Sequence, residues 1–394
     1  MTPAARTQAA IELLDAIVAA ARDQGPAADT LIARYFAGRR YAGSKDRRAV
    51  RELVYAAIRR AGERPVSGRA AMVGLAGDDP ALAATFDGSP HGPAPIAPDE
   101  PVAGPGIAPA WLVDRLRAAG LDEGEMAALI DRAPLDVRVN RLKADREAIR
   151  AALPDARPLA APDGLRLPPG TNVEQLDAFR AGAIEVQDAG SQIVTLAARA
   201  APGMAVIDLC AGAGGKSLAL AAAMADRGTL LASDIDRARL ARLAPRAERA
   251  GASIIAARLL DPGREAEALA DWRDRADVVL IDAPCSGTGT WRRNPEARWR
   301  LTPERLDRLV ATQARLLDLG AGLVKPGGAL VHVVCSLLDA EGADQADRFL
   351  AGHPGWRAES LRLPAGRARR AGVRLTPAHD GSDGFFVARL VRPC

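Results

Sequence analysis

Lysine is scarce in this chain: it occurs at only four positions, so arginine supplies nearly all of the positive charge. The lysines are Lys45, Lys143, Lys216 and Lys325. The excess of alanine, arginine, glycine and proline is typical of a biased source composition. A net charge of +4 over 394 residues therefore identifies no partner by itself.

Cysteine and long apolar runs are also scarce. The four cysteines are widely spaced and form no Cys-x-x-Cys pair, which argues against a disulfide framework and against a zinc site. No apolar run reaches membrane-spanning length, and Glu12 and Asp15 interrupt the stretch where a signal peptide would be apolar. We expect a cytoplasmic protein with no metal and no membrane partner, and nothing in the sequence requires more than a monomer.

Arginines gather in three places along the chain. Ten arginines or lysines lie between Arg34 and Arg64. The two shorter clusters are Arg292, Arg293, Arg298 and Arg300, and Arg367, Arg369, Arg370 and Arg374. Such clusters suit a polyanion such as nucleic acid, but the arginine-rich composition explains them almost as well. They are weak support for a nucleic-acid partner.

The sequence predicts three successive regions. Residues 1–108 show helical spacing of apolar positions and then a Gly/Pro-rich linker from about Gly74, with room for one short helix. Residues 109–187 predict a small α+β module, with a helix from Pro109, a strand at 135–140 and another at 184–186. In residues 188–394 strands and helices alternate, which is typical of a doubly wound parallel sheet.

The expected fold class of the last region is therefore α/β, with five parallel strands. They are predicted at 205–209, 229–233, 253–257, 277–281 and 329–334. Helices are expected at 217–225 and 303–319. A final strand-like run, Gly384–Val391, is expected to add at the edge of the sheet.

The first of these strands leads into a glycine loop, Asp208-Leu-Cys-Ala-Gly-Ala-Gly-Gly-Lys216. A Walker A loop needs glycine where Cys210 stands, and a dinucleotide fingerprint needs glycine or alanine where Ser217 stands. A loop for S-adenosylmethionine has an acidic residue at the strand end before a short glycine turn, and this pattern fits without exception. The loop alone favours a methyltransferase over the two nucleotide-binding alternatives.

Acidic residues also follow the later strands. Asp234 is placed to accept hydrogen bonds from ribose hydroxyls, with Asp236 as a nearby rival. Asp261 could meet the adenine edge, although a helix N-cap before a proline explains it equally well. Asp282 ends the fourth strand. Carboxylates along one sheet edge, where ligands bind in α/β folds, strengthen the methyltransferase interpretation.

Two of the four cysteines stand directly after predicted strands. Cys285 belongs to Asp282-Ala-Pro-Cys-Ser-Gly-Thr-Gly289, and Cys335 follows the strand that ends at Val334. Either thiol alone could be a small buried hydrophobe. Together they predict two thiols at one site.

These blocks resemble the signature of the Nop/Sun family of RNA (cytosine-C5) methyltransferases, and they stand in the family's order. The matching blocks are Asp208–Lys216, Asp282–Gly289, Arg292–Trp299 and Cys335-Ser336, with shorter matches at Arg138–Asn140, Val186–Asp188 and Gly384–Phe386. The similarity covers roughly Pro109 to the C-terminus. The first hundred residues are similar only in kind to the helical RNA-binding domain of some members.

The resemblance implies the cofactor, the catalytic residues and the partner. S-adenosyl-L-methionine would be bound by Cys210, Ala211, Gly212, Ala213, Gly214, Gly215, Lys216, Asp234, Asp261 and Asp282. The nucleophile would be Cys335, with Cys285 assisting product release. RNA would be gripped by the two regions before residue 188. Ribosomal RNA is the expected substrate, and transfer RNA stays open.

Several alternatives remain at the level of the sequence. DNA cytosine-C5 methyltransferases use a Pro-Cys thiol as the nucleophile, which would favour Cys285. Asp282 is expected to bind the base, and Lys216 to neutralise Asp282 or orient a ligand rather than lie in solvent.

Val334 replaces the family's commoner threonine. Rival functions are an inactive RNA-binding or assembly factor on this fold, and a nucleotide hydrolase.

Overall fold

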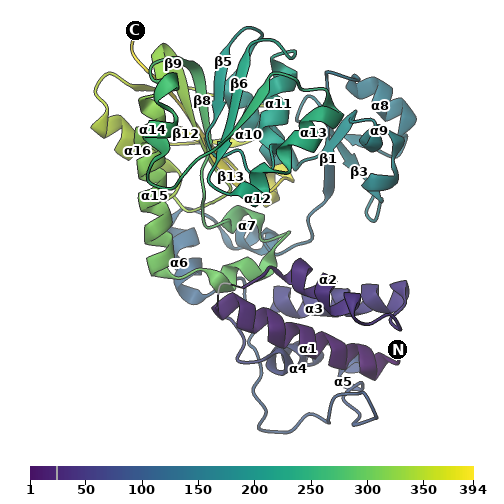
Figure 1. Cartoon of the computed structure of the whole chain (residues 1–394). Helices are drawn as coiled ribbons and strands as arrows, with labels where there is room; N and C mark the ends of the chain where they lie inside the picture. Colours follow the sequence, from purple (N-terminus) through teal and green to yellow (C-terminus); the bar gives the residue numbers. More distant parts are fainter. Residues whose placement is uncertain (24) are drawn as a thin grey trace. The chain divides into compact units, whose positions relative to one another are not determined.

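The computed structural model describes residues 1–23 and 25–394, which form two compact units (Figure 1). One unit contains Met1–Arg132 and Thr290–Thr302, and the other contains Ala133–Gly289 and Pro303–Cys394. The boundaries predicted from the sequence follow chain order and therefore put Thr290–Thr302 in the C-terminal domain, whereas the structure clusters this segment with the N-terminal helices. The rest of the three-part division stays a prediction.

The first unit is helical, as its apolar spacing predicts. Its helices are α1 (Pro3–Arg22), α2 (Ala28–Ala37), α3 (Ser44–Arg60), α4 (Gly68–Ala76), α5 (Pro80–Ala83), α6 (Ala110–Ala118) and α7 (Glu123–Ala128). Side chains cap several N-termini: Thr2 accepts a hydrogen bond from the Ala5 amide, and Ser67 accepts one from the Ala70 amide. The one short helix expected in the linker is α5, and its N-cap is Asp79.

The segment Thr290–Thr302 contributes to this helical unit through buried polar groups. The guanidinium of Arg298 is fully buried and donates to the carbonyl oxygens of Ile58 (2.6 Å), Arg59 (3.2 Å) and Ala61 (2.8 Å). These carbonyls end α3, where the helix has no further amides to satisfy them. Glu296 accepts from the amide of Ala28 (3.0 Å) at the start of α2. The segment thus caps the C-terminus of α3 with a cation and the N-terminus of α2 with a carboxylate.

We predict that Arg298→Ala destabilises the helical unit by about 3 kcal/mol or more, because three carbonyls lose a buried charged donor. Faster hydrogen exchange in α3 and a lower urea midpoint would show this. Arg47→Ala is the control: among the described residues this exposed side chain donates only to the Ala42 carbonyl (2.8 Å), and losing one such hydrogen bond should cost about 0.5–1 kcal/mol. Equal effects of the two substitutions would contradict the capping role.

The second unit opens with a small α+β module that begins at Ala133, whereas the sequence predicts this module from residue 109, with the helix at Pro109 included. Its four-stranded antiparallel sheet has the order β2-β3-β1-β4. The elements are β1 (Leu135–Val139), α8 (Arg146–Ala152), β2 (Arg157–Pro158), β3 (Gly164–Leu167), α9 (Asp177–Arg180) and β4 (Ile184–Val186). Asn140 joins this module to the following domain, because its amide donates to the carbonyls of Gly182 (2.9 Å) and Ala250 (2.8 Å).

The rest of the unit is built on a nine-stranded sheet in the order β11-β12-β13-β9-β8-β5-β6-β7, with β10 paired to β13. The strands are β5 (Ala205–Asp208), β6 (Thr229–Asp234), β7 (Ile255–Leu259), β8 (Ala276–Asp282), β9 (Val324–Val334), β10 (Arg357–Glu359), β11 (Arg367–Arg369), β12 (Gly372–Leu375) and β13 (Phe385–Val391). Strands β5 to β9 are parallel, so the doubly wound α/β fold is confirmed.

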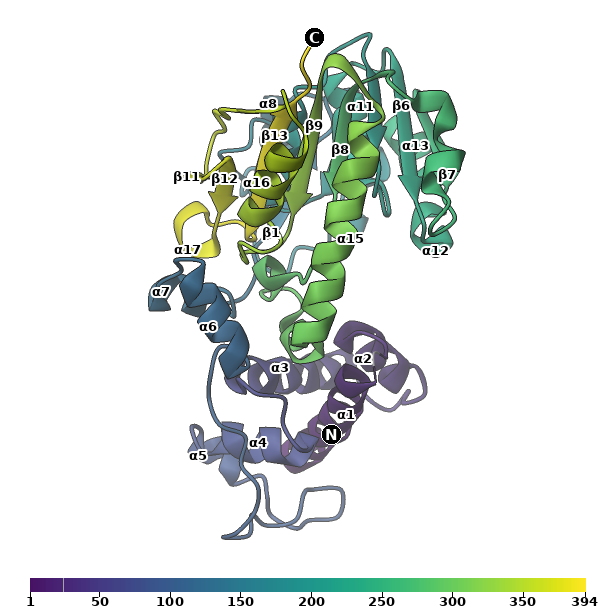
Figure 2. The same ribbon diagram turned by 90° about the vertical axis from the view of Figure 1, so that its left-hand side faces the viewer.

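Helices cover both faces of this sheet (Figures 1 and 2). They are α10 (Ala189–Thr195), α11 (Gly215–Ala223), α12 (Arg237–Leu240), α13 (Leu243–Ala250), α14 (Glu265–Ala268), α15 (Pro303–Ala321), α16 (Ala343–Gly352) and α17 (Pro377–Asp380). Alternate strand residues enter different cores: Val279 packs with α15 and α16, whereas Val278 packs with α10 and α11. A strand buried on both faces reads as a continuous apolar run, which is why the sequence showed these strands clearly.

One strand lies elsewhere than expected. Phe385–Val391 was predicted at the edge of the sheet, but β13 pairs antiparallel with β9 on one side and with β12 on the other. The prediction was wrong because the basic segment before it forms two further short strands, which the sequence did not reveal. In the described part of the chain, no helix is long and apolar enough to cross a membrane.

Candidate active site

The chemistry-bearing residues meet where the strand order reverses. From β5 the chain adds β6 and β7 on one side, and β8 then returns to the other side of β5. The crevice at such a switch point is where open α/β sheets bind ligands. Asp208 ends β5 and Asp282 ends β8, and Cys335 directly follows β9, the neighbour of β8.

The two cysteines predicted at one site are in contact. The sulfur of Cys285 lies 3.4 Å from the sulfur of Cys335. Thr288 and Gly289 tie their loops together, because the Leu337 amide donates to the Thr288 hydroxyl (2.9 Å) and the Gly289 amide donates to the Cys335 carbonyl (3.1 Å). The pairing of two loops from neighbouring strands explains why both blocks are needed for one site.

Gly289 has a steric reason to be glycine. Its carbonyl accepts from the amide of Gly384 (2.8 Å), and a Cβ at Gly289 would lie 2.0 Å from the Gly384 carbonyl oxygen. The Gly384–Phe386 block, which the sequence matched to the family, therefore packs backbone to backbone against the block of Cys285.

Lys216 is a buried cation at this site, not a solvated lysine. Its ammonium lies 2.7 Å from the Asp282 carboxylate and over the ring of Phe385, 5.5 Å from the centroid. Burial by itself would lower the pKa of Lys216, but attraction to Asp282, and more weakly to Cys335 and Asp208, raises it above the ordinary value. Lys216 is thus a positively charged side chain close to Asp282 and Cys335, two groups that can carry negative charge.

The other titratable groups near the cysteines have distinct states. The contact with Cys335, together with burial, raises the pKa of the Cys285 thiol well above its ordinary range. Burial lowers the pKa of His332 to about 4, so this imidazole is neutral. His332 is fully buried, as expected of a packed core residue rather than a base. Val334 also lies in the apolar core, and the hydroxyls near Cys335 come from the neighbouring serines and Thr288 instead.

A buried carboxylate that the sequence did not single out lies under both cysteine loops. Glu341 is fully buried and accepts hydrogen bonds from the side chains of Ser286, Ser336 and Gln313. Ser286 and Ser336 directly follow the two cysteines. A lone glutamate six positions after Cys335 carries no local pattern, so only the fold could reveal its partners.

The glycine loop forms the turn between β5 and α11. Gly212 (φ +54°) and Gly214 (φ +83°) adopt the left-handed conformation, and a Cβ at Gly214 would lie 2.1 Å from a Leu243 methyl. Of the two rival acids, Asp234 faces this loop, because it accepts from the Gly212 amide (2.7 Å). Asp236 instead caps α12.

Comparison with known proteins places this geometry in a family. The family model described as 16S rRNA methyltransferase RsmB/F matches residues 195–391. The chain belongs to this family. The resemblance to the Nop/Sun methyltransferases is thereby confirmed, and the cofactor of the RsmB/F fold is S-adenosyl-L-methionine.

Individual relatives agree with this membership. A ribosomal RNA small subunit methyltransferase B from Xylella fastidiosa is 38% identical over 299 residues, which cover 72% of this chain and 68% of that protein. A probable one from Synechocystis is 35% identical over 299 residues, covering 72% of this chain and 66% of the relative. The matches thus span about two thirds of the relatives' length. The structure of NSun6 from Pyrococcus horikoshii with SFG has the same fold, with a TM-score of 0.65, 18% identity and coverage of 72% and 98% of the two chains.

The residues of this RsmB/F member fit its cofactor. Asp208 is fully buried, and its Oδ1 atom has no hydrogen-bond partner among the described residues, although Oδ2 accepts from the Ser217 hydroxyl (2.7 Å). Such an atom needs a donor, and the ammonium of the methionine part of the cofactor would supply one. Asp234 and the glycine turn would receive the ribose, and burial keeps Cys210 a thiol by raising its pKa well above the ordinary value. Asp261 is exposed and is not the N-cap of α14, and its contact with adenine stays a prediction.

We predict that Asp208 makes stability depend on pH. Burial raises its pKa to about 7 from 3.8, so the folded form binds more protons between these values and is destabilised as the pH rises through them. Asp208→Asn should therefore gain stability relative to the parent, by up to about 4 kcal/mol at pH 8 compared with pH 4. Urea titrations without cofactor across this range measure it.

A second substitution checks the cause. The Ser217 hydrogen bond lowers the pKa of Asp208, so Ser217→Ala should move the loss of stability to higher pH. A difference between Asp208→Asn and the parent that does not change with pH would contradict the burial of an ionisable carboxyl here.

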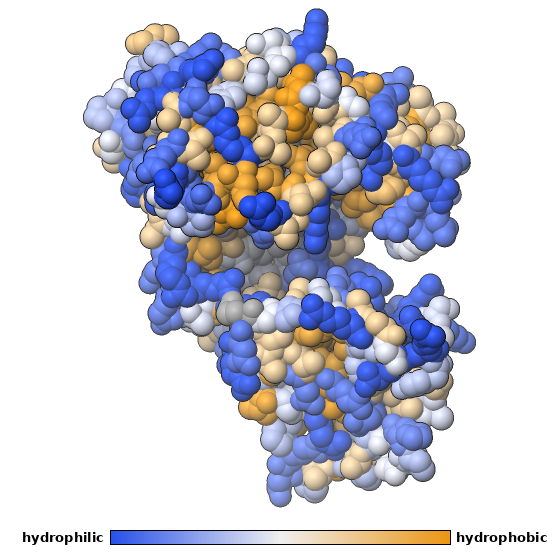
Figure 3. All heavy atoms as spheres, in the orientation of Figure 1, coloured by the Kyte–Doolittle hydropathy of each residue, from blue (hydrophilic) through white to orange (hydrophobic). Residues whose placement is uncertain are grey.

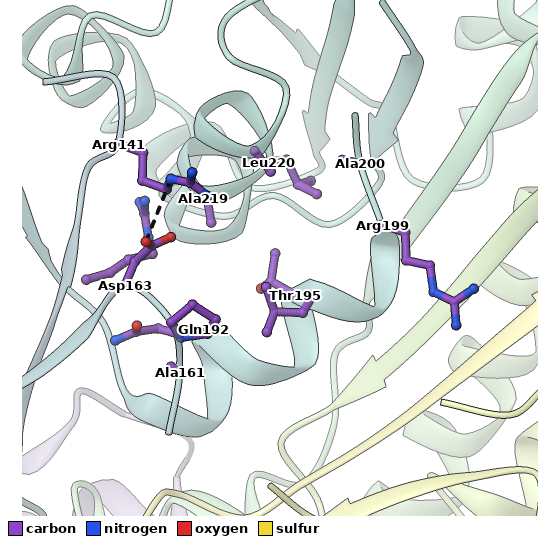
Figure 4. Close-up of a pocket in the computed structure, with 13 residues that line it drawn as sticks. Arg141, Ala161, Asp163, Gln192, Thr195, Arg199, Ala200, Ala219 and Leu220 are labelled. Atoms are coloured by element: carbon purple, nitrogen blue, oxygen red, sulfur yellow. Dashed lines mark ion pairs between the residues drawn. The ribbon is translucent and has the colours of Figure 1, made fainter. Parts of the chain in front are cut away.

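A separate hollow of about 150 Å³ lies between the small module and helices α10 and α11 (Figure 4). Arg141 and Asp163 point toward each other at its rim, 3.9 Å apart. None of the residues predicted for catalysis or cofactor binding lines it. We therefore expect the cofactor at the switch point and not in this hollow.

Proposed function

We propose that this chain transfers a methyl group from S-adenosyl-L-methionine to carbon 5 of a cytosine in ribosomal RNA of the small subunit. The observation that carries the proposal is the contact between Cys285 and Cys335, 3.4 Å apart, beside the ion pair of Lys216 and Asp282. The names of the relatives, ribosomal RNA small subunit methyltransferase B, support the choice of RNA.

The proposed reaction needs a sulfur nucleophile, because carbon 5 of cytosine does not attack a methyl sulfonium unaided. A thiolate of Cys335 adds to carbon 6, and the electron pair of the C5=C6 bond makes carbon 5 nucleophilic. The bound cofactor supplies the electrophilic methyl group. A base then removes the proton from carbon 5, the double bond re-forms and the sulfur of Cys335 leaves.

The state of the two thiols supports Cys335 as the nucleophile. Its contact with Cys335 and its burial raise the pKa of the Cys285 thiol well above the ordinary value, which suits a thiol that keeps its proton. One thiolate and one thiol in contact suit an attacking group and a second group that assists release. The family resemblance supports the same division of roles.

The ion pair beside the thiols suits the charge that develops on the ring. Asp282 would hydrogen-bond the cytosine near N3, and Lys216 would keep Asp282 oriented. A base inside a helix cannot reach two thiols at a sheet edge. The target cytosine is therefore expected to be unpaired or flipped out of its stack.

The three arginine clusters differ in how available their charges are for binding RNA. In the N-terminal cluster, Arg34, Arg40, Lys45, Arg48 and Arg64 are exposed and form no ion pair with any described residue. Hydrophilic residues are prominent over these helices on the face shown in Figure 3. The cluster of Arg369, Arg370 and Arg374 is instead paired with carboxylates of the same unit, such as Asp339. Arg298 is buried, so its predicted place in a polyanion-binding cluster was wrong.

The direct test is methyl transfer to purified small-subunit RNA with labelled S-adenosyl-L-methionine, followed by digestion and nucleoside analysis. We expect label in 5-methylcytosine, and bisulfite mapping then gives the position. Label in another nucleoside, or transfer to transfer RNA alone, would overturn the assignment. Stabilisation of the protein by ATP without binding of S-adenosyl-L-methionine would instead favour the nucleotide hydrolase.

A further inference from the structure

The buried carboxylate of Glu341 accepts four hydrogen bonds, from three residues. Its Oε1 atom accepts from the Ser286 amide (2.8 Å) and from the Gln313 side chain (3.0 Å). Its Oε2 atom accepts from the Ser336 hydroxyl (2.5 Å) and from the Ser286 hydroxyl. A fully buried carboxylate is costly unless such donors surround it, and apolar residues of similar size would stabilise a core at least as well.

The donors belong to the two loops that carry the thiols. Ser286 follows Cys285 and Ser336 follows Cys335, and the two serine hydroxyls also contact each other at 3.2 Å. One carboxylate therefore joins both loops one residue away from each sulfur. The position of Glu341 thereby bears on the distance between the sulfurs.

Glu341 is in turn fixed to rigid elements. Its carbonyl accepts from Nε2 of His332 on β9 (2.9 Å), and since a carbonyl can only accept, the neutral imidazole carries its proton on Nε2. Gln313 on α15 donates both to Glu341 and to the carbonyl of Pro284 (2.9 Å). Through Glu341, both loops are thus anchored to strand β9 and helix α15.

We infer that Glu341 is a positioning residue that holds the Cys285 and Cys335 loops in register, so that the two thiols stay in contact. The inference deepens the proposed function and rests on it for its role in the reaction. Glu341 touches neither sulfur through a hydrogen bond and acts through Ser286 and Ser336. Its direct consequence, the closeness of the thiols, can be measured without RNA.

The first experiment measures that closeness by oxidation. Diamide takes two electrons and two protons from a pair of neighbouring thiols and leaves a disulfide, which peptide mass spectrometry assigns to Cys285 and Cys335. We expect Glu341→Ala to form this disulfide about tenfold more slowly than the parent, since small misplacements cost large factors in proximity-driven reactions. An unchanged rate would overturn the inference.

Glu341→Gln separates connectivity from charge. Its amide oxygen can accept from the Ser286 amide and Gln313, and its amide nitrogen can donate to the serine hydroxyls, which also accept. We expect its disulfide rate to stay within about threefold of the parent. A loss as large as that of Glu341→Ala would contradict positioning through these hydrogen bonds.

A matched control removes another buried glutamate of the same unit. Glu265 is also buried and pairs with Arg315 (2.9 Å) away from the cysteine loops. Glu265→Ala should lower stability but leave the disulfide rate unchanged, whereas an equal slowing would show that general loosening is the cause. If Glu341→Ala does not fold, the double variant Ser286→Ala/Ser336→Ala replaces it, with the same slowing expected and an unchanged rate again overturning the inference.

Kinetics then connect the positioning to catalysis. Glu341→Ala should lower kcat while the KM for S-adenosyl-L-methionine stays unchanged, and Glu341→Gln should restore most of kcat. If the disulfide slows but the parent methylates no cytosine, the positioning stands and the proposed function fails. If the parent methylates cytosine and Glu341→Ala matches it in both assays, the positioning alone fails.

Discussion

Cys335→Ala should abolish methyl transfer, with a loss of about 10⁴-fold or more in turnover, because the proposed nucleophile that adds to carbon 6 and activates carbon 5 is removed. The same substitution should remove every covalent protein–RNA adduct. Transfer of label from S-adenosyl-L-methionine measures the first effect, and denaturing gel electrophoresis of the enzyme with RNA measures the second.

The chain offers a control for this substitution. Cys394 is an exposed thiol at the C-terminal residue of the chain, and Cys394→Ser should leave both transfer and adduct formation unchanged. Binding of S-adenosyl-L-methionine to Cys335→Ala should also persist, since the glycine loop and Asp234 do not depend on this sulfur. Full activity of Cys335→Ala would show that Cys335 is not the nucleophile.

Cys285→Ala should have the opposite signature and trap RNA on the protein. Addition by Cys335 and methylation can still proceed, but release is slowed when the thiol 3.4 Å from Cys335 is missing. We expect a gel-stable adduct with a stoichiometry approaching one RNA per protein, and a low number of turnovers. The double substitution of Cys285 and Cys335 should show no adduct.

The pattern of the two single variants decides between the roles. If Cys335→Ala traps RNA and Cys285→Ala is inert, the two roles are exchanged, as a DNA-type Pro-Cys mechanism would have it. The fold and the contact between the thiols would survive that result. Adduct formation by neither variant would count against a covalent route.

Much of the fold could be predicted because its strands are buried on both faces. The apolar runs of β5, β6, β8 and β9 stand out between polar segments, and the structure confirms them. The edge strand β7 begins two residues later than expected, at Ile255 rather than Ser253. Its half-exposed residues give a weaker pattern than those of the central strands.

The short matching blocks also have structural reasons that the sequence alone does not state. The buried side chain of Arg138 donates a hydrogen bond to the side chain of Gln187 (2.7 Å). Asp188 caps α10 and accepts from the amide of Asp383 (3.0 Å), which precedes the last block. Three blocks far apart in the chain are therefore one hydrogen-bonded unit around the start of α10.

The sequence by itself determined the α/β fold, the glycine turn and the two cysteines at strand ends, because these depend on local periodicity and on residues next to each other in the chain. Only the tertiary structure decided that Asp234 rather than Asp236 faces the turn, that Arg298 is buried, and that Glu341 joins the two thiol loops. Such partners lie up to 240 positions apart. The sequence specifies which side chains are charged. Whether a charged side chain contacts solvent, a carbonyl or a carboxylate depends on packing between segments that are distant in the chain.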